Sequence, residues 1–471
     1  MTERCMNLKS CTLSVLAAAS LLAGCSQLQP YQRPEQPMPT AWAGVGSTAA
    51  QPLPWQSFVT DPVLRALVDK ALKNNRDLRV AALQIEQARA QHQIRRAATM
   101  PTVNLGATGD RQAKGDAEEI TGTYMAGLMV NSWEIDFFGR LASLKEAALA
   151  DYLATEEARK SAQITLVAAV VSGWLNLQSS EAQLALTQQT LTSREEALRL
   201  TQLRYRYGAA DALGLRQAES LTESARSTLA QLERQRSLDL NALALLIGQP
   251  VNQVLTPAEL APQTGQPLSA FEAVTEVPLG LPSTVLLERP DVRAAEQQLV
   301  AANAKIGAAR AAFFPNISLT AGFGTASTEL SGLFKSGSTG WLLTPQILLP
   351  IFDGGANRAG LSSAQAGQGI ALAQYEKVIQ TAFREVNDAL AGQATLGRQL
   401  QAQEALVRAE ADRLRLAQML MQKGVSSQLE VLDAERSLFS AQQAAVQARA
   451  ALAQNRVALY KALGGGWQAA N

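Results

Sequence analysis

The chain has 471 residues, of which 18% are charged and 5% aromatic, and 42 lysine and arginine residues balance 41 aspartate and glutamate residues to a net charge of +1. At about 100 to 200 residues per domain, this length allows two to four domains. A charge so close to zero gives no broad attraction for nucleic acid, so none is expected as a partner. The single histidine, His92, cannot build a multi-histidine metal site, which argues against metal-dependent hydrolysis or redox chemistry.

The first residues have the pattern of a signal peptide. Arg4 and Lys9 precede an apolar run, Leu13–Gly24, which is too short to cross a bilayer but has the length of a signal-peptide core. The three cysteines all lie in this region, at positions 5, 11 and 25, so the rest of the chain holds no thiol and no disulfide framework. We therefore expect residues 1–24 to be removed during secretion.

The end of this segment, Leu22–Cys25, resembles a bacterial lipobox. A chance cysteine after small residues is the alternative interpretation. The resemblance implies that Cys25 becomes the first residue of the mature chain and carries a diacylglycerol and an N-palmitoyl group. Ser26, rather than aspartate, follows the cysteine, and the lipoprotein sorting rule then implies the outer membrane.

The sequence contains an internal duplication. Asp77–Ala107 aligns without gaps onto Asp291–Ala321 at an offset of 214, with 12 of 31 positions identical. A period above about 200 residues is too long for a solenoid unit, so the chain is one two-fold duplication whose halves should fold alike. The correspondence continues at offsets of 214 and then 216 through the pairs Phe138/Phe352 and Gly248/Gly464.

Each half is predicted to carry one β-hairpin. Pro101 and Pro315 end the preceding helices, because proline lacks an N–H and disfavours helical geometry in the residue before it. Apolar and polar side chains then alternate, as in a strand with two different faces. Pro345 weakens the prediction of the last strand, since an interior strand position would lose a ladder bond. The predicted loops are Asp110–Gly122 and Thr325–Gly340, and the returning strands are Thr123–Ile135 and Trp341–Ile351.

A proline-free stretch follows each hairpin, Leu141–Ile247 and Ala356–Leu463, and strong helix formers dominate both. Each stretch is predicted to turn once, at Gly208 and at Gly424, where glycine suits a left-handed cap. The first arm, Leu141–Tyr207, would be on the order of 100 Å long if helical throughout. A globular domain does not need helices of that length.

These elements divide the chain into five parts. Residues 1–24 are the signal peptide and residues 25–57 an extended segment. Residues 58–249 form the first repeat, with a hairpin at 101–136 and long helices at 138–248. A proline-rich equatorial junction covers 250–284, and residues 285–471 form the second repeat, with a hairpin at 315–352 and long helices at 356–464.

Four strands per chain imply an oligomeric pore. A tilted strand of about 9 to 11 residues crosses a hydrocarbon layer, but there an open sheet edge leaves backbone groups unpaired, so the strands must close into a barrel. Two chains would supply 8 strands, whose side chains fill the interior, whereas three would supply 12 and leave a lumen. The long alanine-rich helices, packed side by side, would continue such a barrel as a helical tube.

Several motifs together make the chain similar to the outer-membrane efflux factors of the TolC and OprM type. The motifs are the lipobox, Pro30–Pro34, Trp133–Gly139, Leu287–Arg293, Phe313–Leu319, Pro350–Gly355 and Leu459–Trp467. The resemblance implies an α+β membrane protein, a homotrimer whose 12-stranded outer-membrane β-barrel, four strands per chain, continues into a long periplasmic α-helical barrel. It also implies docking to a periplasmic adaptor protein and an inner-membrane proton-driven pump of the resistance-nodulation-division type, with no cofactor besides the lipid on Cys25.

The same resemblance implies a gate at the periplasmic helix tips. Leu429, Asp433 and Arg436 lie at i, i+4 and i+7, on one helical face, and match the family's gate-forming residues. We expect Leu429 to form an apolar constriction, and Asp433 and Arg436 to form salt bridges between helices. The alternative is an ordinary surface ion pair of little energetic weight. The first repeat carries Leu213, Gln217 and Ser220 instead.

The two predicted tip turns are candidate adaptor contacts. The first turn offers Arg204, Arg206 and Gly208, and the second offers Lys423 and Gly424; simple solvated caps are the alternative. Asp136 and Asp353, at the junctions between strand and helix, are interpreted as cap or turn residues rather than catalytic acids.

The sequence therefore favours a passive exit duct for a tripartite drug-efflux system. Two other functions fit part of the sequence. Polypeptide export in a type I secretion system would use a related channel, and a lipid-anchored coiled-coil scaffold would explain the helices but not the hairpins. No polar catalytic constellation supports an enzyme.

Overall fold

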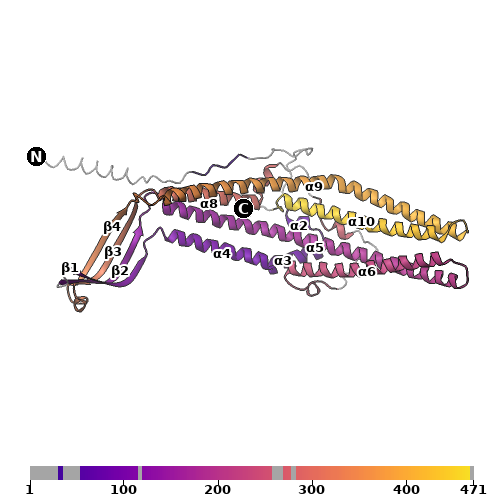
Figure 1. Ribbon diagram of the computed structural model, residues 1–471, viewed down its shortest axis with the longest axis horizontal. Coiled ribbons are helices and arrows are strands. Elements are labelled where there is room, and N and C mark those ends of the chain that lie inside the picture. The colour runs from indigo at the N-terminus through magenta and orange to yellow at the C-terminus, as the bar shows by residue number, and fades with distance from the viewer. Residues whose placement is uncertain (1–29, 36–52, 115–118, 257–268, 277–282, 467–471) are drawn as a thin grey trace. The chain divides into compact units, whose positions relative to one another are not determined.

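The computed structural model describes residues 30–35, 53–114, 119–256, 269–276 and 283–466, so the predicted signal peptide and Cys25 lie outside the described residues. The chain divides into two compact units, drawn together in Figure 1. The sheet unit draws on Met1–Glu35, Gln84–Glu156 and Arg293–Lys377, and the helical unit on Gln36–Leu83, Glu157–Val292 and Val378–Asn471. Each unit combines segments from both halves of the duplication, and the predicted domain boundaries stay a prediction.

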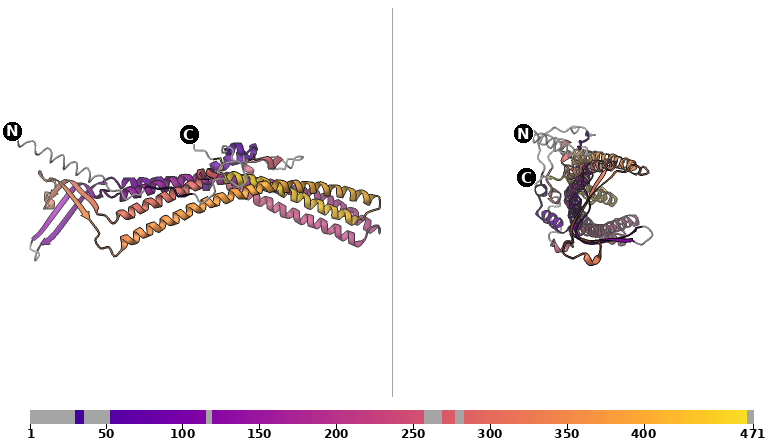
Figure 2. Two further views of the ribbon diagram at one scale, coloured as in Figure 1. Left: turned by 90° about the horizontal axis from the view of Figure 1, so that it is seen from above. Right: turned by 90° about the vertical axis from the view of Figure 1, so that its left-hand side faces the viewer.

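The sheet unit contains one antiparallel sheet with the strand order β1-β2-β3-β4. The four strands lie side by side in the views of Figures 1 and 2. The two predicted hairpins are β1–β2 and β3–β4, and the pairing of β2 with β3 joins the two halves of the duplication into one sheet. The strands are β1 Val103–Lys114, β2 Glu119–Glu134, β3 Asn316–Ser327 and β4 Thr339–Leu348.

The first hairpin is longer than predicted. The predicted loop over Asp110–Gly122 was wrong, because the ladder continues from Asp110↔Thr123 to Lys114↔Glu119. The isoleucine, threonine and tyrosine residues at 120–124 favour a strand. Their preference outweighs that of the glycine and charged residues of the predicted loop, which disfavour one. At the other end of the sheet, β4 stops at Leu348 rather than Ile351, just before Pro350, which has no N–H to donate.

Pro345 fits within β4 because of its place in the ladder. The backbone N–H of Ala326 donates to the carbonyl of Ser338 at 2.7 Å, which makes that pair a hydrogen-bonded one. Hydrogen-bonded and non-hydrogen-bonded pairs alternate along antiparallel strands, so Pro345, opposite Leu319, falls in a non-hydrogen-bonded pair. Its missing N–H therefore costs no bond to β3, and β4 lies at the edge of the described sheet, where proline is tolerated.

Six helices of 22 to 67 residues make up most of the rest of the described chain. The predicted turns are confirmed, since α5 ends just before Gly208 and α9 just before Gly424. The helices α4 and α8 end a few residues before Pro101 and Pro315, as expected. The long helices are α4 Arg76–Ala97, α5 Arg140–Arg206, α6 Ala212–Ile247, α8 Pro290–Ala311, α9 Ala356–Gln422 and α10 Gln428–Ala462. The short ones are α2 Trp55–Phe58, α3 Pro62–Asn74, η1 Val251–Gln253, η2 Ser269–Glu272, η3 Ser283–Glu288 and η4 Leu330–Gly332.

The helical unit has a conventional apolar core around α2, α3 and the ends of the long helices. The side chains of Leu64 and Leu67 in α3 and of Ile247 in α6 are fully buried. The ring of Phe58 stacks on that of Tyr460, with the centroids 4.0 Å apart. The buried face of α10 is mostly alanine, and small residues let neighbouring helices approach closely without a wide apolar face. These buried alanines are Ala434, Ala441, Ala445, Ala448, Ala453 and Ala462.

A buried arginine joins three helices within this unit. The Arg289 guanidinium donates to both carboxylate oxygens of Asp291 at 3.0 and 2.7 Å, to Glu385 Oε2 at 3.0 Å and to the carbonyl of Ala462 at 2.5 Å. These bonds tie the start of α8 to the middle of α9 and to the last turn of α10. The Leu287–Arg293 motif therefore has a structural role at the end of α10.

Candidate channel surfaces and gate

The sheet has one strongly apolar face. The register places Leu105, Leu128, Phe323 and Trp341 in one row across all four strands, and these side chains remain exposed, with Leu105 at 83% and Trp341 at 76%. Side chains on one face of a sheet alternate along each strand. The neighbouring members of this apolar face are Val103, Val130, Ala321, Leu343 and Ile347.

The opposite face is composed mainly of small and polar residues, with a few methionine and leucine side chains. Its polar members include Asn104, Thr108, Thr320, Thr344 and Gln346, and its glycines are Gly106, Gly127, Gly322 and Gly324. A sheet with one apolar face towards lipid and one polar face towards water has the pattern of a membrane barrel. This division gives the sheet a lipid side and a lumen side.

The two outer strands have one paired side each. Within the described residues, β1 pairs only with β2 and β4 only with β3. The strands contain 10 to 16 residues, enough to cross a hydrocarbon layer when tilted. None of the described helices is long and apolar enough to cross a membrane.

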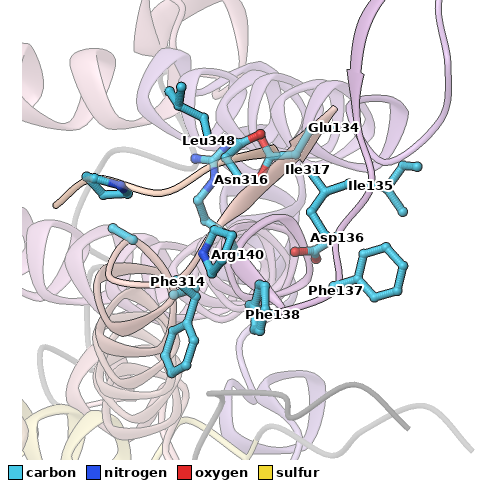
Figure 3. A pocket seen from close by; sticks show the side chains of 14 residues that line it. Glu134, Ile135, Asp136, Phe137, Phe138, Arg140, Phe314, Asn316, Ile317 and Leu348 are labelled. Atoms are coloured by element: carbon cyan, nitrogen blue, oxygen red, sulfur yellow. Dashed lines mark hydrogen bonds and ion pairs between the residues drawn. The ribbon is translucent and has the colours of Figure 1, made fainter. Parts of the chain in front are cut away.

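The junction between strand and helix forms a compact polar joint (Figure 3). Arg140, at the start of α5, donates from Nε and Nη2 to the two carboxylate oxygens of Glu134 at 2.8 and 2.6 Å. Asp136 accepts the backbone N–H of Ala142 at 2.6 Å. These groups line a pocket of about 260 Å³, and their charges are satisfied by one another and by the backbone. The joint is therefore structural rather than a binding site.

Asp353 has the same role in the second half. Its carboxylate accepts the backbone N–H groups of Asn357 at 2.7 Å and Gly355 at 2.9 Å, and these bonds lower the pKa of Asp353. The interpretation of Asp136 and Asp353 as cap residues is confirmed. Within the described parts of the chain, no group of three or more His, Cys, Asp or Glu could hold a metal ion.

The two helix tips are tight turns built on glycine. Gly208 and Gly424 have φ angles of 74° and 76°, in the left-handed region that side chains with a Cβ rarely adopt. In the first turn, the N–H of Ala209 donates to the carbonyl of Arg204 at 2.8 Å, and in the second the N–H of Val425 donates to that of Leu420 at 3.0 Å. These bonds satisfy carbonyl groups that the helix ends would otherwise leave unpaired.

The turns expose both charged and apolar groups. The side chains of Arg204, Arg206 and Lys423 are exposed, as predicted for polar contacts. Tyr207 and Val425 are also exposed, at 81% and 74%, and no sequence pattern singled them out. Each tip therefore presents an apolar side chain beside its basic residues.

The second helix of each tip starts differently. Asp211 caps α6, and its carboxylate accepts the N–H of Gly214 at 2.8 Å. Ser427 occupies the corresponding position before α10, but its side chain makes no capping hydrogen bond. The start of α10 therefore lacks a local stabilising contact that α6 has.

The predicted gate residues lie in the first turns of α10. Leu429 is 52% exposed. Asp433 accepts hydrogen bonds from Arg436 on the same helix and from Nη2 of Arg413 on α9, the latter at 2.5 Å. These bonds, chiefly that from Arg413, hold the pKa of Asp433 below its usual value. Within one chain, Asp433 is thus paired both along its own helix and across to α9.

Sequence reasoning missed Arg413, although a signal was present. In an antiparallel helical hairpin, residues at equal distances from the turn face each other. Arg413 and Asp433 lie ten residues before and ten residues after Lys423, the start of the turn. That symmetry identifies Arg413 as the partner of Asp433 across the hairpin.

The other side of α10 contacts α5. Gln428 donates to the hydroxyl of Thr201 at 2.6 Å, and the Arg194 guanidinium lies 5.1 Å from the ring centroid of Phe439, a cation–π contact. Arg194 is buried, which lowers its pKa, and the nearby charge of Glu435 partly offsets this effect. The first turns of α10 are therefore bound to α9 on one side and to α5 on the other.

Comparison with known proteins identifies the family. The model of the family described as "Outer membrane efflux protein" matches residues 67–249 and 281–465, one segment in each half of the duplication. The chain is 44% identical to the "Probable efflux pump outer membrane protein TtgC" of Pseudomonas putida over 470 residues, which cover 97% of this chain and 95% of the relative. It is also 44% identical to the "Outer membrane protein OprJ" of Pseudomonas aeruginosa over 465 residues, covering 97% and 96% of the two chains.

Solved structures agree. The open state of the Neisseria gonorrhoeae MtrE outer membrane channel matches with a TM-score of 0.83 and 38% identity, over 94% of this chain and 98% of that one. The resemblance and the fold class predicted from the motifs, including the internal repeat, are confirmed. The chain belongs to the outer membrane efflux protein family.

Proposed function

We propose that this chain is the outer-membrane exit duct of a tripartite multidrug efflux system. It would passively conduct antibiotics and other small toxic compounds from a periplasmic adaptor and a proton-driven inner-membrane pump to the exterior. The observation that carries the proposal is the sheet, with one apolar face, one face of small and polar residues, and two edges without partners in the described chain. A duct needs no covalent step, because the partner pump supplies the energy.

Three copies of the chain complete the barrel in this proposal. The unpaired edge of β4 in one copy pairs with that of β1 in the next, so that the backbone donors and acceptors along these edges find partners within the hydrocarbon layer, and the one position of β4 without an N–H is Pro345. Twelve strands leave a lumen, whereas eight leave an interior filled by side chains. The row from Leu105 to Trp341 faces lipid, and the opposite face of the sheet, which includes Asn104 and Thr320, faces the lumen. A scaffold without a channel would not require these two different faces.

The lipid on Cys25 belongs to the same proposal. A diacylglycerol and an N-palmitoyl group there would hold the mature N-terminus in the outer membrane, and the long helices would extend into the periplasm. No other cofactor is needed for passive conduction.

The two faces of the sheet can be tested with adjacent residues of β1. Replacing Leu105 with arginine places a charge on the lipid side, where the cost is about 2 to 4 kcal/mol at the bilayer midplane and falls towards the interfaces. Replacing Asn104 with arginine places the same charge in the lumen. We expect Leu105→Arg to lower the amount of membrane-inserted protein, and Asn104→Arg to insert normally but change the ion selectivity of single channels. Equal insertion of the two variants would contradict the assigned faces.

The resting pore is proposed to be closed by the first turns of α10. Leu429 supplies an apolar constriction, and Asp433 and Arg436 supply the charges that hold neighbouring helices together. The bond from Arg413 to Asp433 supports this arrangement, because it fixes the carboxylate against α9. The bond between Gln428 and Thr201 holds the same turns against α5.

The gate is tested by single-channel recording. Asp433→Ala combined with Arg436→Ala should raise the closed-state current by about tenfold, within the usual range of conformational coupling. Arg413→Ala alone should raise it by a smaller factor, because Asp433 keeps its contact with Arg436. The matched control is Arg415→Ala, which removes a surface ion pair with Asp412 on the same helix. An unchanged closed-state current in the double variant would contradict the gate.

The helix tips are proposed to contact the adaptor. In this proposal, the first turn contributes Arg204, Arg206 and Gly208, and the second contributes Lys423 and Gly424. The basic side chains supply charge, and the glycines allow the sharp turns. Tyr207 and Val425 are the apolar anchors. Interfaces commonly combine exposed aromatic side chains with arginine in this way.

This contact is tested by crosslinking in native membranes followed by pull-down of the chain. The unaltered chain should recover a periplasmic adaptor and an inner-membrane pump. Arg204→Glu combined with Arg206→Glu should reduce the recovery of adaptor while leaving conductance in bilayers unchanged. Recovery of neither partner by the unaltered chain would contradict the tripartite assignment.

A further inference from the structure

The helices that meet the sheet have two different sides, and the described N-terminal segment, residues 30–35, marks one of them. This segment lines a groove of about 480 Å³ together with α8 and α9, which contribute Asn303 and Leu372 among others. Arg33 of the segment donates from Nε and Nη2 to the two carboxylate oxygens of Glu296 on α8, both at 2.6 Å. We call the side of the helices that carries this groove the groove side.

The duplication identifies the same side of the other two helices. On the groove side, Gln368 of α9 donates to the side chain of Asn303 of α8 at 3.2 Å. At the corresponding place in the first half, Arg89 of α4 donates to the hydroxyl of Tyr152 of α5, also at 3.2 Å. The two contacts are related by the repeat offsets of 214 and 216. Since the two halves lie side by side in one sheet, equivalent contacts lie on the same side of the helices.

Each of these four helices carries one basic residue on the groove side, close to the strands. Seven residues make nearly two helical turns, so side chains seven or fourteen residues apart share a face. All four side chains are exposed or partly exposed, and we call them the basic belt. They are Arg96, seven residues after Arg89; Lys145, seven before Tyr152; Arg310, seven after Asn303; and Arg358, fourteen before Leu372.

The belt lies at the depth of lipid headgroups. Arg96 and Arg310 are the second-last residues of α4 and α8, and Lys145 and Arg358 are the sixth and third residues of α5 and α9. Each therefore lies within about 8 Å, measured along the helix, of the end that meets the strands. The polar headgroup layer of a bilayer is about 5 to 8 Å thick on each side of the hydrocarbon core. Cations at this level are within reach of the phosphate groups.

Exposed apolar side chains occupy the short connections between the strands and the belt. Ile351 and Phe352 are 87% and 92% exposed, and Met100 and Phe313 are also exposed. From the sheet outwards, the order is therefore an apolar face, exposed apolar connections and then cations. Hydrocarbon, interface and phosphate follow one another in the same order across a lipid leaflet.

The carboxylates at these helix ends do not neutralise the belt. Glu134 already forms the ion pair of the joint described above, and Asp136 and Asp353 accept backbone N–H groups. Glu146 follows a belt residue directly but lies about 100° away around α5. In the part of the chain that the structure describes, no belt side chain forms an ion pair, although Arg358 lies near Asp353. The four cations are thus available to an external anion.

The groove side faces outwards in the proposed tube. A conducting tube must keep its inner surface clear, whereas the N-terminal segment lies across the groove side. The opposite side of α8 carries Lys305, which is 54% exposed and pairs with Asp151 of α5 at 3.6 Å. Lys305 lies two residues after Asn303 and therefore about 200° around the helix from it. The belt and the lipid face of the sheet then share the outer surface.

We propose that the basic belt binds the phosphate groups of anionic phospholipids in the leaflet that surrounds the helix ends. Guanidinium groups bind phosphate oxygens through pairs of hydrogen bonds, and long basic side chains extend along an apolar surface to reach them. Three chains with four such residues each would place twelve cations around the barrel. The inference rests on the proposed duct, because it uses the outward direction that the duct assigns to the groove side.

The test counts lipids that stay bound to the full-length protein. Native mass spectrometry of protein released from nanodiscs with equal amounts of phosphatidylglycerol and phosphatidylcholine gives the ratio of the two bound lipids. The unaltered protein should retain phosphatidylglycerol in at least about fivefold excess, the scale of one cation at an anionic surface. Replacing all four belt residues with glutamine should bring the ratio close to one, and Arg310→Gln alone should lower it in part.

Matched variants of α8 separate the belt from a general effect of charge. Lys305→Gln removes a cation from the opposite side of the same helix and should leave the ratio unchanged. Arg310→Lys keeps the charge and should keep most of the preference. The belt is overturned if the fourfold variant inserts and retains the parent ratio. If that variant fails to insert, an equal effect of Lys305→Gln and Arg310→Gln overturns it.

Single-channel recording in bilayers of phosphatidylcholine alone tests the duct separately. A protein that conducts but shows no lipid preference would refute the belt and leave the duct intact. A well-folded protein that forms no channel would contradict the duct, whatever lipids it binds. A changed ion selectivity of Arg310→Gln with an unchanged lipid ratio would place this cation in the lumen and overturn the belt.

Discussion

The requirement that every backbone hydrogen-bonding group be paired within lipid governs the rest of this structure. One chain supplies four strands, and in the described chain the sheet they form has an unpaired edge at β1 and another at β4. In water such edges would be hydrated, but a hydrocarbon layer offers no donors or acceptors. The apolar row from Leu105 to Trp341 indicates that this sheet faces hydrocarbon. The chain is therefore one part of a closed assembly, and the proposed channel is a consequence of closing it.

At the helix tips, the contacts that hold the first turns of α10 are mainly between charged and polar side chains. Asp433 is shared by Arg413 and Arg436, and the same turns of α10 are bound to α5 through Gln428. The contacts at Asp433 are exposed polar pairs rather than apolar packing, and individually such pairs are weak. If these turns form the proposed gate, a partner that competes for such weak contacts can open it. The missing side-chain cap at Ser427 leaves the start of α10 more dependent on these contacts than α6 is.

Much of the fold could be predicted because the determining signals are local. Pro101 and Pro315 end helices through their own geometry, the alternation after Pro315 gives a strand, and Gly208 and Gly424 allow the left-handed turns. Because the sequence is duplicated, each element predicted in one half is supported by its counterpart in the other half. The predicted loop at Asp110–Gly122 was wrong because the isoleucine, threonine and tyrosine residues at 120–124 favour a strand more strongly than the glycine and charged residues of that stretch oppose it.

The contacts that sequence reasoning missed join residues far apart in the chain. Arg33 and Glu296 are separated by 263 positions, and neither residue shows by itself that it will be buried with the other. Arg413 could have been found from its symmetric distance to the turn at Lys423, because that turn was itself predicted from Gly424. The exposure of Tyr207 and Val425 follows from the sharpness of the turns, which leaves these side chains nothing to pack against.

The mass of the particle in lipid tests the central claim most directly. Native mass spectrometry of the full-length protein released from nanodiscs counts the chains in each inserted particle. Closure of the four-stranded sheet with a conducting lumen predicts three chains per particle, with no population of single inserted chains. A stable, membrane-inserted particle of one or two well-folded chains would contradict the account.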